Sequence, residues 1–161
     1  MRSEIGIEID AEPGLVFALA HDVERWSTLL PHYARSVAGD REDPARPIVR
    51  FVARRPLIPV LGLGLPVVWA ARCWNDPTSH RLQFEHVAGA TRGMRVTWRI
   101  EPRDGGSHVT IEHEFAPAIP GLAWVVDRWF TRPIASRTLA TFKALAEAVQ
   151  SAGLVQTNPP S

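Results

Sequence analysis

The sequence contains a single cysteine, Cys73, so it cannot form an intramolecular disulfide. It also lacks an apolar run of the ~20 residues that a membrane span needs, because Pro, Gly or charge interrupts its two most apolar stretches, 56–71 and 119–130. The N-terminal residues show no long apolar segment of the kind found in secretory signals. We therefore expect a soluble protein of the reducing cytoplasm, without stable membrane insertion.

The sequence also has no excess of basic or acidic residues. The chain has 18 basic and 17 acidic side chains and a formal net charge of +1, which does not favour binding to nucleic acid. No repeat, low-complexity tract or linker divides its 161 residues, so we expect one domain over 1–156 and a loose tail over 157–161.

Two kinds of bound group are not expected. There is no HxxxH or HExxH spacing of the kind that binds metal. Gly62-Leu63-Gly64 lacks the third glycine and the strand-to-helix context of a dinucleotide-binding loop. The sequence therefore predicts neither a metal site nor a cofactor.

Alternation of apolar and polar residues is abundant and predicts strands with one buried face. Ile5, Ile7 and Ile9 alternate with small or charged residues in the first of them. Six more strands, separated by turn-rich segments, are predicted over 34–39, 48–54, 67–74, 81–87, 94–101 and 108–115. Because most of them follow one another directly, an antiparallel meander is the simplest topology.

Helical patterns flank these strands. Two short helices are predicted after the first strand, from about 11 to 22 and over 23–33. An apolar stripe with helical spacing predicts a long helix from Pro133 to about Gly153. Because proline fits the first turn of a helix better than its interior, 121–130 is predicted to be a separate helix.

Together these elements define an α+β fold class. We expect the helix-grip arrangement, in which a seven-stranded curved antiparallel sheet surrounds a long C-terminal helix and two short helices follow the first strand. Side chains cannot completely fill such a sheet when the short helices hold its mouth open. The fold therefore predicts an internal cavity that binds a hydrophobic small molecule.

Alternation also predicts which residues line this cavity. On strand 67–74 either face contains a tryptophan, and we prefer the face with Trp69 and Cys73 as interior. Ordinary core packing explains any single aromatic residue equally well. The ligand-binding candidates on the strands are Phe51, Trp69, Cys73, Phe84, Met94, Trp98 and Ile111, and those on the helical segments are Trp26, Leu30 and Trp124.

Two histidines stand on otherwise apolar strand faces, where a titratable imidazole is costly unless it has a partner. A lone interior histidine is usually structural. However, His86 and His113 share one inferred face, with Tyr33 near the mouth, and this favours ligand contact or proton transfer. Cys73 has no predicted base beside it, so we do not expect it to act as a nucleophile.

The segment 56–66 is almost wholly apolar, which is unusual between strands. Four explanations remain open. It packs on 121–130, it covers the cavity as a lid, it touches a membrane transiently at the cavity entrance, or it forms a dimer contact. The sequence therefore allows a monomer or a homodimer.

Several short motifs, taken in order, resemble the START-like helix-grip (SRPBCC) superfamily, and within it the polyketide cyclase/dehydrase group of aromatase/cyclase-like proteins. The resemblance spans nearly the whole chain. The motifs are Ile7–Pro13 before Val16-Phe17, Asp22–Trp26 leading to Leu30 and Tyr33, Met94–Trp98, and Glu112–Phe115.

The resemblance implies that Trp26, Tyr33, Trp69 and Trp98 line the pocket. It also implies an arginine on the strand of Trp69 that polarises a substrate carbonyl. Cys73 occupies the aligned position and Arg72 lies one residue away, so Arg72 is a catalytic candidate only if a bulge turns it inward. The catalytic candidates are thus Tyr33, His86, His113 and Arg72.

Two functional hypotheses follow. The first is an enzyme that cyclises and dehydrates a polyketide-like substrate to an aromatic product. The second is a protein that binds or transports a lipid or quinone without catalysis. A regulatory partner of another macromolecule is a third, less specific possibility. Fold alone does not distinguish them.

Overall fold

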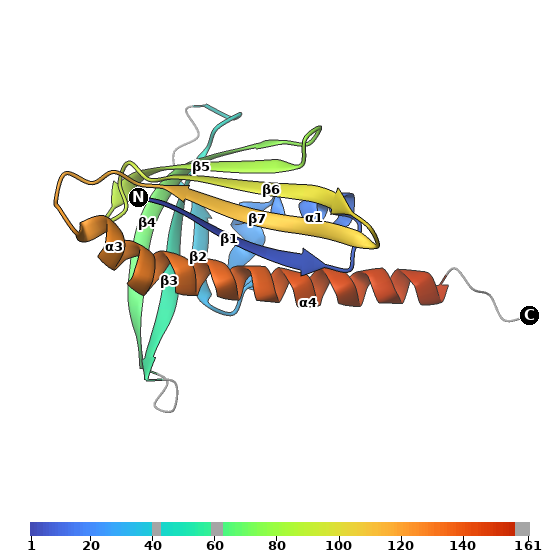
Figure 1. Cartoon of the computed structure of the whole chain (residues 1–161). Coiled ribbons are helices and arrows are strands. Elements are labelled where there is room, and N and C mark those ends of the chain that lie inside the picture. The colour runs from blue at the N-terminus through green and yellow to red at the C-terminus, as the bar shows by residue number, and fades with distance from the viewer. Residues whose placement is uncertain (40–42, 59–62, 157–161) are drawn as a thin grey trace, which may run out of the picture.

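The computed structural model describes residues 1–39, 43–58 and 63–156. Within these residues seven strands form one antiparallel sheet in the order β1-β7-β6-β5-β4-β3-β2. Strands β2 to β7 pair consecutively as a meander, and β1 lies beside β7 (Figure 1). The strands are β1 (Arg2–Ile9), β2 (Tyr33–Ala38), β3 (Ile48–Ile58), β4 (Leu63–Asp76), β5 (Arg81–Gly89), β6 (Arg95–Arg103) and β7 (Gly106–Glu114).

The helices lie where the helix-grip fold requires them. The long helix α4 (Arg132–Gln156) runs along the sheet and contacts β1, and its last turns extend beyond the strands (Figure 1). Three short elements follow β1, namely α1 (Pro13–Ala20), η1 (Val23–Arg25) and α2 (Trp26–Leu29). This arrangement confirms the fold class expected from the sequence. The predicted second helix is shorter than expected, because the residue before Pro31 is driven out of the helical region.

The prediction of a separate helix over 121–130 is wrong. After Gly121, helix α3 (Leu122–Val126), a π-helical turn η3 (Asp127–Thr131) and α4 follow one another without a break. The backbone N–H of Arg132 bonds to the carbonyl of Asp127, five residues back. This wider turn lies immediately before Pro133, which has no N–H to donate, so the helix continues through the proline.

The segment 56–66 is less of a loop than expected, because β3 continues to Ile58 and β4 begins at Leu63. These two strands project beyond the rest of the sheet in Figure 1. Residues 59–62, on which the predicted lid partly falls, lie outside the described residues, as does the predicted tail over 157–161.

Trp26 is the centre of the core. It is 4% exposed, its indole N–H donates to the carbonyl of Ala20 at 2.9 Å, and its ring lies 5.4–5.9 Å from five other aromatic rings. Those rings come from β2, β3, β5, β6 and α4, so the Trp26 side chain contacts both the sheet and the long helix. They belong to Tyr33, Phe51, Phe84, Trp98 and Phe142.

Candidate ligand-binding cavity

A cavity of about 90 Å³ remains between the concave face of the sheet and the start of α4. Its walls are mostly aromatic and aliphatic, with a few hydroxyl and imidazole groups among them. The lining residues are Trp26, Tyr33, Phe51, Val67, Trp69, Phe84, His86, Thr91, Met94, Val96, Trp98, Ile111, His113, Phe130, Thr131, Ile134, Ala135 and Thr138. Pockets that hold drug-sized ligands have ~300–1,000 Å³, so a polycyclic ligand requires these side chains to move apart.

Trp69 forms a flat wall on β4. Its ring stacks on Phe51 at 5.3 Å and on His86 at 6.0 Å, with interplanar angles of 19° and 17°. The backbone holds this wall in place, because Gly89 pairs with Trp69 and has a φ of +95°. A Cβ at Gly89 would lie 2.6 Å from the carbonyl oxygen of Val68. Only glycine allows this approach.

His86 and His113 face the cavity as neutral imidazoles. Burial, with a smaller contribution from His113, lowers the pKa of His86 to about 3, and His86 Nδ1 lies 2.6 Å from Thr91 Oγ1. Burial also lowers the pKa of His113 to about 4, although the carboxylate of Asp127 opposes the shift. His113 Nδ1 is buried and has no hydrogen-bond partner among the described residues. A buried nitrogen of this kind is available to a ligand.

Tyr33 and Thr138 add hydroxyl groups to the same cavity. Burial raises the pKa of the Tyr33 phenol, and the hydroxyl of Thr138 opposes that shift. Thr138 donates to the carbonyl of Ile134 at 2.9 Å, so its oxygen accepts from His32 Nε2, also at 2.9 Å. Burial lowers the pKa of His32 to about 4, with a smaller effect from the charge of Arg137.

The polar groups of the cavity are therefore neutral at pH 7. No carboxylate, lysine or arginine is among the lining residues in the described part of the chain. In the same residues, no three His, Cys, Asp or Glu side chains come together as a metal site. A charged ligand would lose its hydration here without gaining a counter-charge, so the cavity suits a neutral hydrophobic molecule that carries hydrogen-bonding groups.

Comparison with known families accounts for an apolar cavity that contains neutral hydrogen-bonding groups. Residues 2–147 match the family model described as polyketide cyclase / dehydrase and lipid transport. The chain belongs to this family. The match covers most of the chain, and the family accounts for a cavity that binds hydrophobic small molecules. A search of curated proteins found no match.

Solved structures show the same fold. An aromatase/cyclase from Streptomyces sp. R1128 superimposes with a TM-score of 0.75 at 18% identity, covering 95% of this chain and 98% of that one. The di-domain ARO/CYC of the BE-7585A biosynthetic pathway gives a TM-score of 0.70 at 26% identity, and the match covers 99% of this chain and 48% of that protein. A START superfamily protein from Mycobacterium smegmatis gives a TM-score of 0.67 at 13% identity, and the match covers 92% of this chain and 98% of that one. The chain thus corresponds to about half of the di-domain protein.

In this member of the family, the structure brings together most of the residues predicted for the site. Three of the four catalytic candidates line the cavity, namely Tyr33, His86 and His113. So do seven of the ten ligand-binding candidates, Trp26, Phe51, Trp69, Phe84, Met94, Trp98 and Ile111.

The condition on which Arg72 is a catalytic candidate, a bulge that turns it toward the cavity, is not met in β4. Arg72 Nη1 lies 3.2 Å from Glu85 Oε2 on the neighbouring strand, and both side chains are 40% exposed. The register shift between β4 and β5 falls between Ala70 and Ala71 on one strand and skips Val87 on the other. The extra residue is therefore in β5, so alternation on β4 keeps Arg72 on the outer face.

Three ligand-binding candidates do not line this cavity either. Leu30 is fully buried in the core, and Trp124 is 66% exposed on the outer side of α3. Cys73 lies at a second cavity together with His21 and Asp22. Burial raises the pKa of the Cys73 thiol to about 12, and the thiol is 3.4 Å from the carbonyl of Ala71. A thiol in this environment is not nucleophilic.

The sequence analysis missed the contribution of the helix to the site. Ile134, Ala135 and Thr138 lie on the face of α4 that is directed at the cavity. Thr138 follows Ile134 by four residues and Ala135 by three, and this spacing was a usable signal, because residues three or four apart are neighbours on a helix surface. Thr91 was not predictable in this way, since it comes from the turn between β5 and β6 and is placed by its contact with His86.

Proposed function

We propose that this protein binds a neutral polyketide-like molecule in the aromatic cavity and promotes its cyclisation and dehydration to an aromatic product without a cofactor. The observation that carries the proposal is the pair of neutral imidazoles, His86 and His113, in an otherwise apolar cavity. His113 Nδ1 supports it most directly, because this buried atom has no partner among the described side chains and backbone groups.

The reaction needs two kinds of help that these groups supply. Removal of a proton from a carbon between two carbonyls gives an enolate, and the enolate carbon then attacks a second carbonyl of the same chain. A neutral imidazole that donates a hydrogen bond stabilises the negative oxygen formed at each stage. Between mostly apolar walls, this interaction is stronger than in bulk solvent.

The same ring nitrogens serve the proton transfers. A developing negative charge on the substrate favours the protonated imidazole, so it raises the low pKa values of His86 and His113 while the reaction proceeds. The proton taken from carbon is given to the alkoxide that ring closure forms, which makes it a hydroxyl group. Removal of a second proton from the same carbon, and its transfer to this hydroxyl group, then forms the double bond as water leaves. Tyr33, whose phenol stays protonated, is placed to donate to a carbonyl at the same wall.

The aromatic walls hold the substrate in a folded shape. Phe51, Trp69 and His86 form a continuous stack along one side, against which a flat ring packs. Such confinement brings the reacting carbons together and lowers the entropic cost of ring closure.

The test uses a synthetic linear poly-β-ketone as the substrate, with water loss followed by mass spectrometry and binding followed by calorimetry. His113→Phe and Tyr33→Phe should abolish product formation while ligand affinity stays within about tenfold of the wild type, or ~1.4 kcal/mol. His108→Phe is the matched control, because His108 lies on the same strand and contacts Glu8 outside the cavity.

Unchanged product formation in both cavity variants would contradict the catalytic assignment. Tight binding without turnover in the wild type would instead favour the second hypothesis, a protein that binds or carries its ligand.

A further inference from the structure

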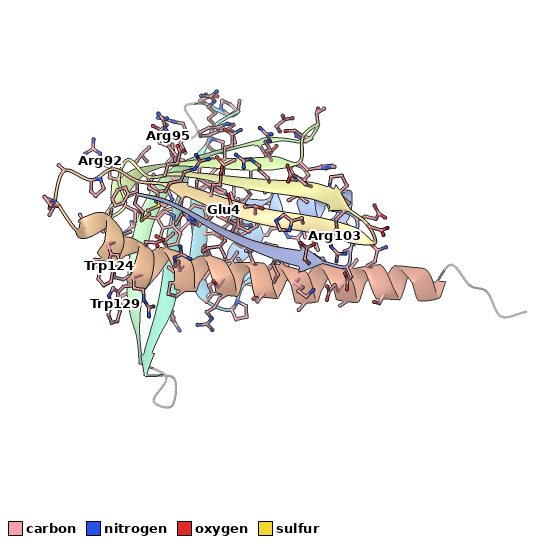
Figure 2. The ribbon with its side chains drawn as sticks, viewed as in Figure 1. Glu4, Arg92, Arg95, Arg103, Trp124 and Trp129 are labelled. Carbon is pink, nitrogen blue, oxygen red and sulfur yellow. The ribbon has the colours of Figure 1, made fainter. Side chains whose placement is uncertain are left out.

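Two tryptophans are exposed on the outer side of the helix that borders the cavity. Trp124 is 66% exposed and Trp129 is 49% exposed, with Val125 at 40% and Ile119 at 64% close by in sequence. Figure 2 shows both indoles on the outer side of this helix. Large apolar side chains exposed together mark an interaction surface.

The charge of this surface is positive. Residues 116–137 contain three arginines and one acidic residue, in a chain whose overall net charge is only +1. The acidic residue, Asp127, is directed inward, where it accepts hydrogen bonds from Ser3 Oγ and Arg132 Nε, each at 2.8 Å. Arg128 is exposed beside the tryptophans. Arg92, from the β5–β6 turn, projects at the same end of the molecule in Figure 2.

The same helical segment forms a wall of the cavity. Phe130, Thr131 and Ile134 line the cavity, whereas Trp124, Val125 and Trp129 are exposed outside. The π-helical turn contains an extra residue relative to an α-helix, which rotates α3 relative to α4. The outer face is thus separated from the cavity by the thickness of one helix. We call Ile119, Trp124, Val125, Arg128 and Trp129 the rim face.

We propose that the rim face docks on the surface of an anionic lipid bilayer. Indole rings favour the headgroup region, where their apolar body and N–H group are both accommodated, and arginines are attracted to lipid phosphates. Docking by the rim face places the cavity wall against the bilayer, the phase into which a hydrophobic ligand partitions. The contact is peripheral, since no helix in residues 1–39, 43–58 and 63–156 is long and apolar enough to cross a bilayer.

The experiment is co-sedimentation with vesicles of phosphatidylcholine alone or of phosphatidylcholine with phosphatidylglycerol. The wild type should bind the anionic vesicles and not the neutral ones, and the binding should weaken as salt is added. Trp124→Ala combined with Trp129→Ala should weaken binding by about tenfold or more, and so should Arg128→Glu.

Valine provides a matched control. Val125 is 40% exposed on the rim face and Val149 is 47% exposed far along α4. Val125→Asp should abolish vesicle binding, whereas Val149→Asp should leave it unchanged. Circular dichroism and thermal unfolding show whether each variant is folded.

Three results would overturn the proposal. The first is equal binding of both aspartate variants to anionic vesicles, and the second is no binding by the wild type. The third is a wild-type dimer in sedimentation velocity that Val125→Asp converts to a monomer, which would assign the rim face to a second copy of the chain. Because no reaction is measured, these outcomes are independent of the proposed catalysis.

Discussion

The buried histidines make the stability of this protein depend on pH in a direction that the structure fixes. An imidazole has a pKa of about 6.5 in an unfolded chain. In the folded protein burial lowers the pKa to about 4 at His113 and at His32. Between pH 6.5 and 4 these two sites therefore take up protons only when the chain unfolds. Stability rises with pH wherever the unfolded state binds more protons, so acidification must destabilise the fold.

The magnitude follows from the same pKa values. Below pH 6.5 each such site lowers the free energy of unfolding by about 1.4 kcal/mol per pH unit. From pH 7 to pH 5 this amounts to about 2 kcal/mol for His113 and a similar amount for His32. His86, whose pKa is lowered to about 3, acts in the same direction. Glu112 and Glu147 have lowered pKa values, so their contribution is lost only below about pH 4.5.

Urea unfolding at pH 7, 6 and 5 measures this effect. His113→Gln cannot be protonated in this range, so the stability that the variant loses between pH 7 and 5 should be about 2 kcal/mol less than the loss in the wild type. His21→Gln, at an exposed site, is the control. If the wild type and His113→Gln lose the same stability on acidification, His113 is not held neutral by burial, and the role given to it in the cavity fails as well.

Three further outcomes are expected. Trp26→Ala removes the ring at the centre of the aromatic core and should lower the free energy of unfolding by about 3–5 kcal/mol in urea titrations. Arg72→Ala breaks only the half-exposed pair with Glu85, so it should cost at most ~1 kcal/mol in stability and leave ligand affinity and turnover unchanged. Cys73 should react with a thiol reagent only at the rate of unfolding in a stopped-flow assay, because burial raises the pKa of its thiol to about 12.

Alternation along the strands was enough to predict most of the cavity walls. Phe51, Phe84 and Trp98 share the concave face because every second residue of a strand points the same way. The helix covers only one face of the sheet, so that face is the one that is buried. The fold was predictable for the same reason, since consecutive strands and a terminal amphipathic helix have few ways to pack.

For Arg72, strand alternation and the family resemblance predict opposite side-chain directions. Alternation placed Cys73 inside and therefore Arg72 outside, whereas resemblance to aromatase/cyclases called for an inward arginine. The bulge that would reconcile them exists, but it lies in β5 rather than in β4. Its position depends on how two strands pair, and the sequence of one strand does not contain that information.

Trp124 failed as a candidate for a different physical reason. A separate helix over 121–130 leaves the direction of Trp124 relative to the long helix undetermined, and the π-helical turn at 127–131 sets that direction between α3 and α4. Residues after the turn, such as Thr138, meet the cavity, while Trp124 before it is on the outside. Pro133 is a sign of irregularity in the sequence, but a proline fits the first turn of a helix equally well and so predicts a helix start there.

The small size of the cavity links ligand entry to the rim face on the outer side of its helical wall. A void of about 90 Å³ is smaller than a polycyclic ligand, so the aromatic walls must separate before such a molecule enters. The sheet side of the cavity is tied together by the backbone ladder, and Trp69 is held in position by Gly89. The helical side contributes Phe130 and Thr131, which come from the π-helical turn and not from a strand of that ladder. We therefore expect the cavity to open at this segment, so that whatever binds the rim face outside it also acts on the wall that a ligand passes.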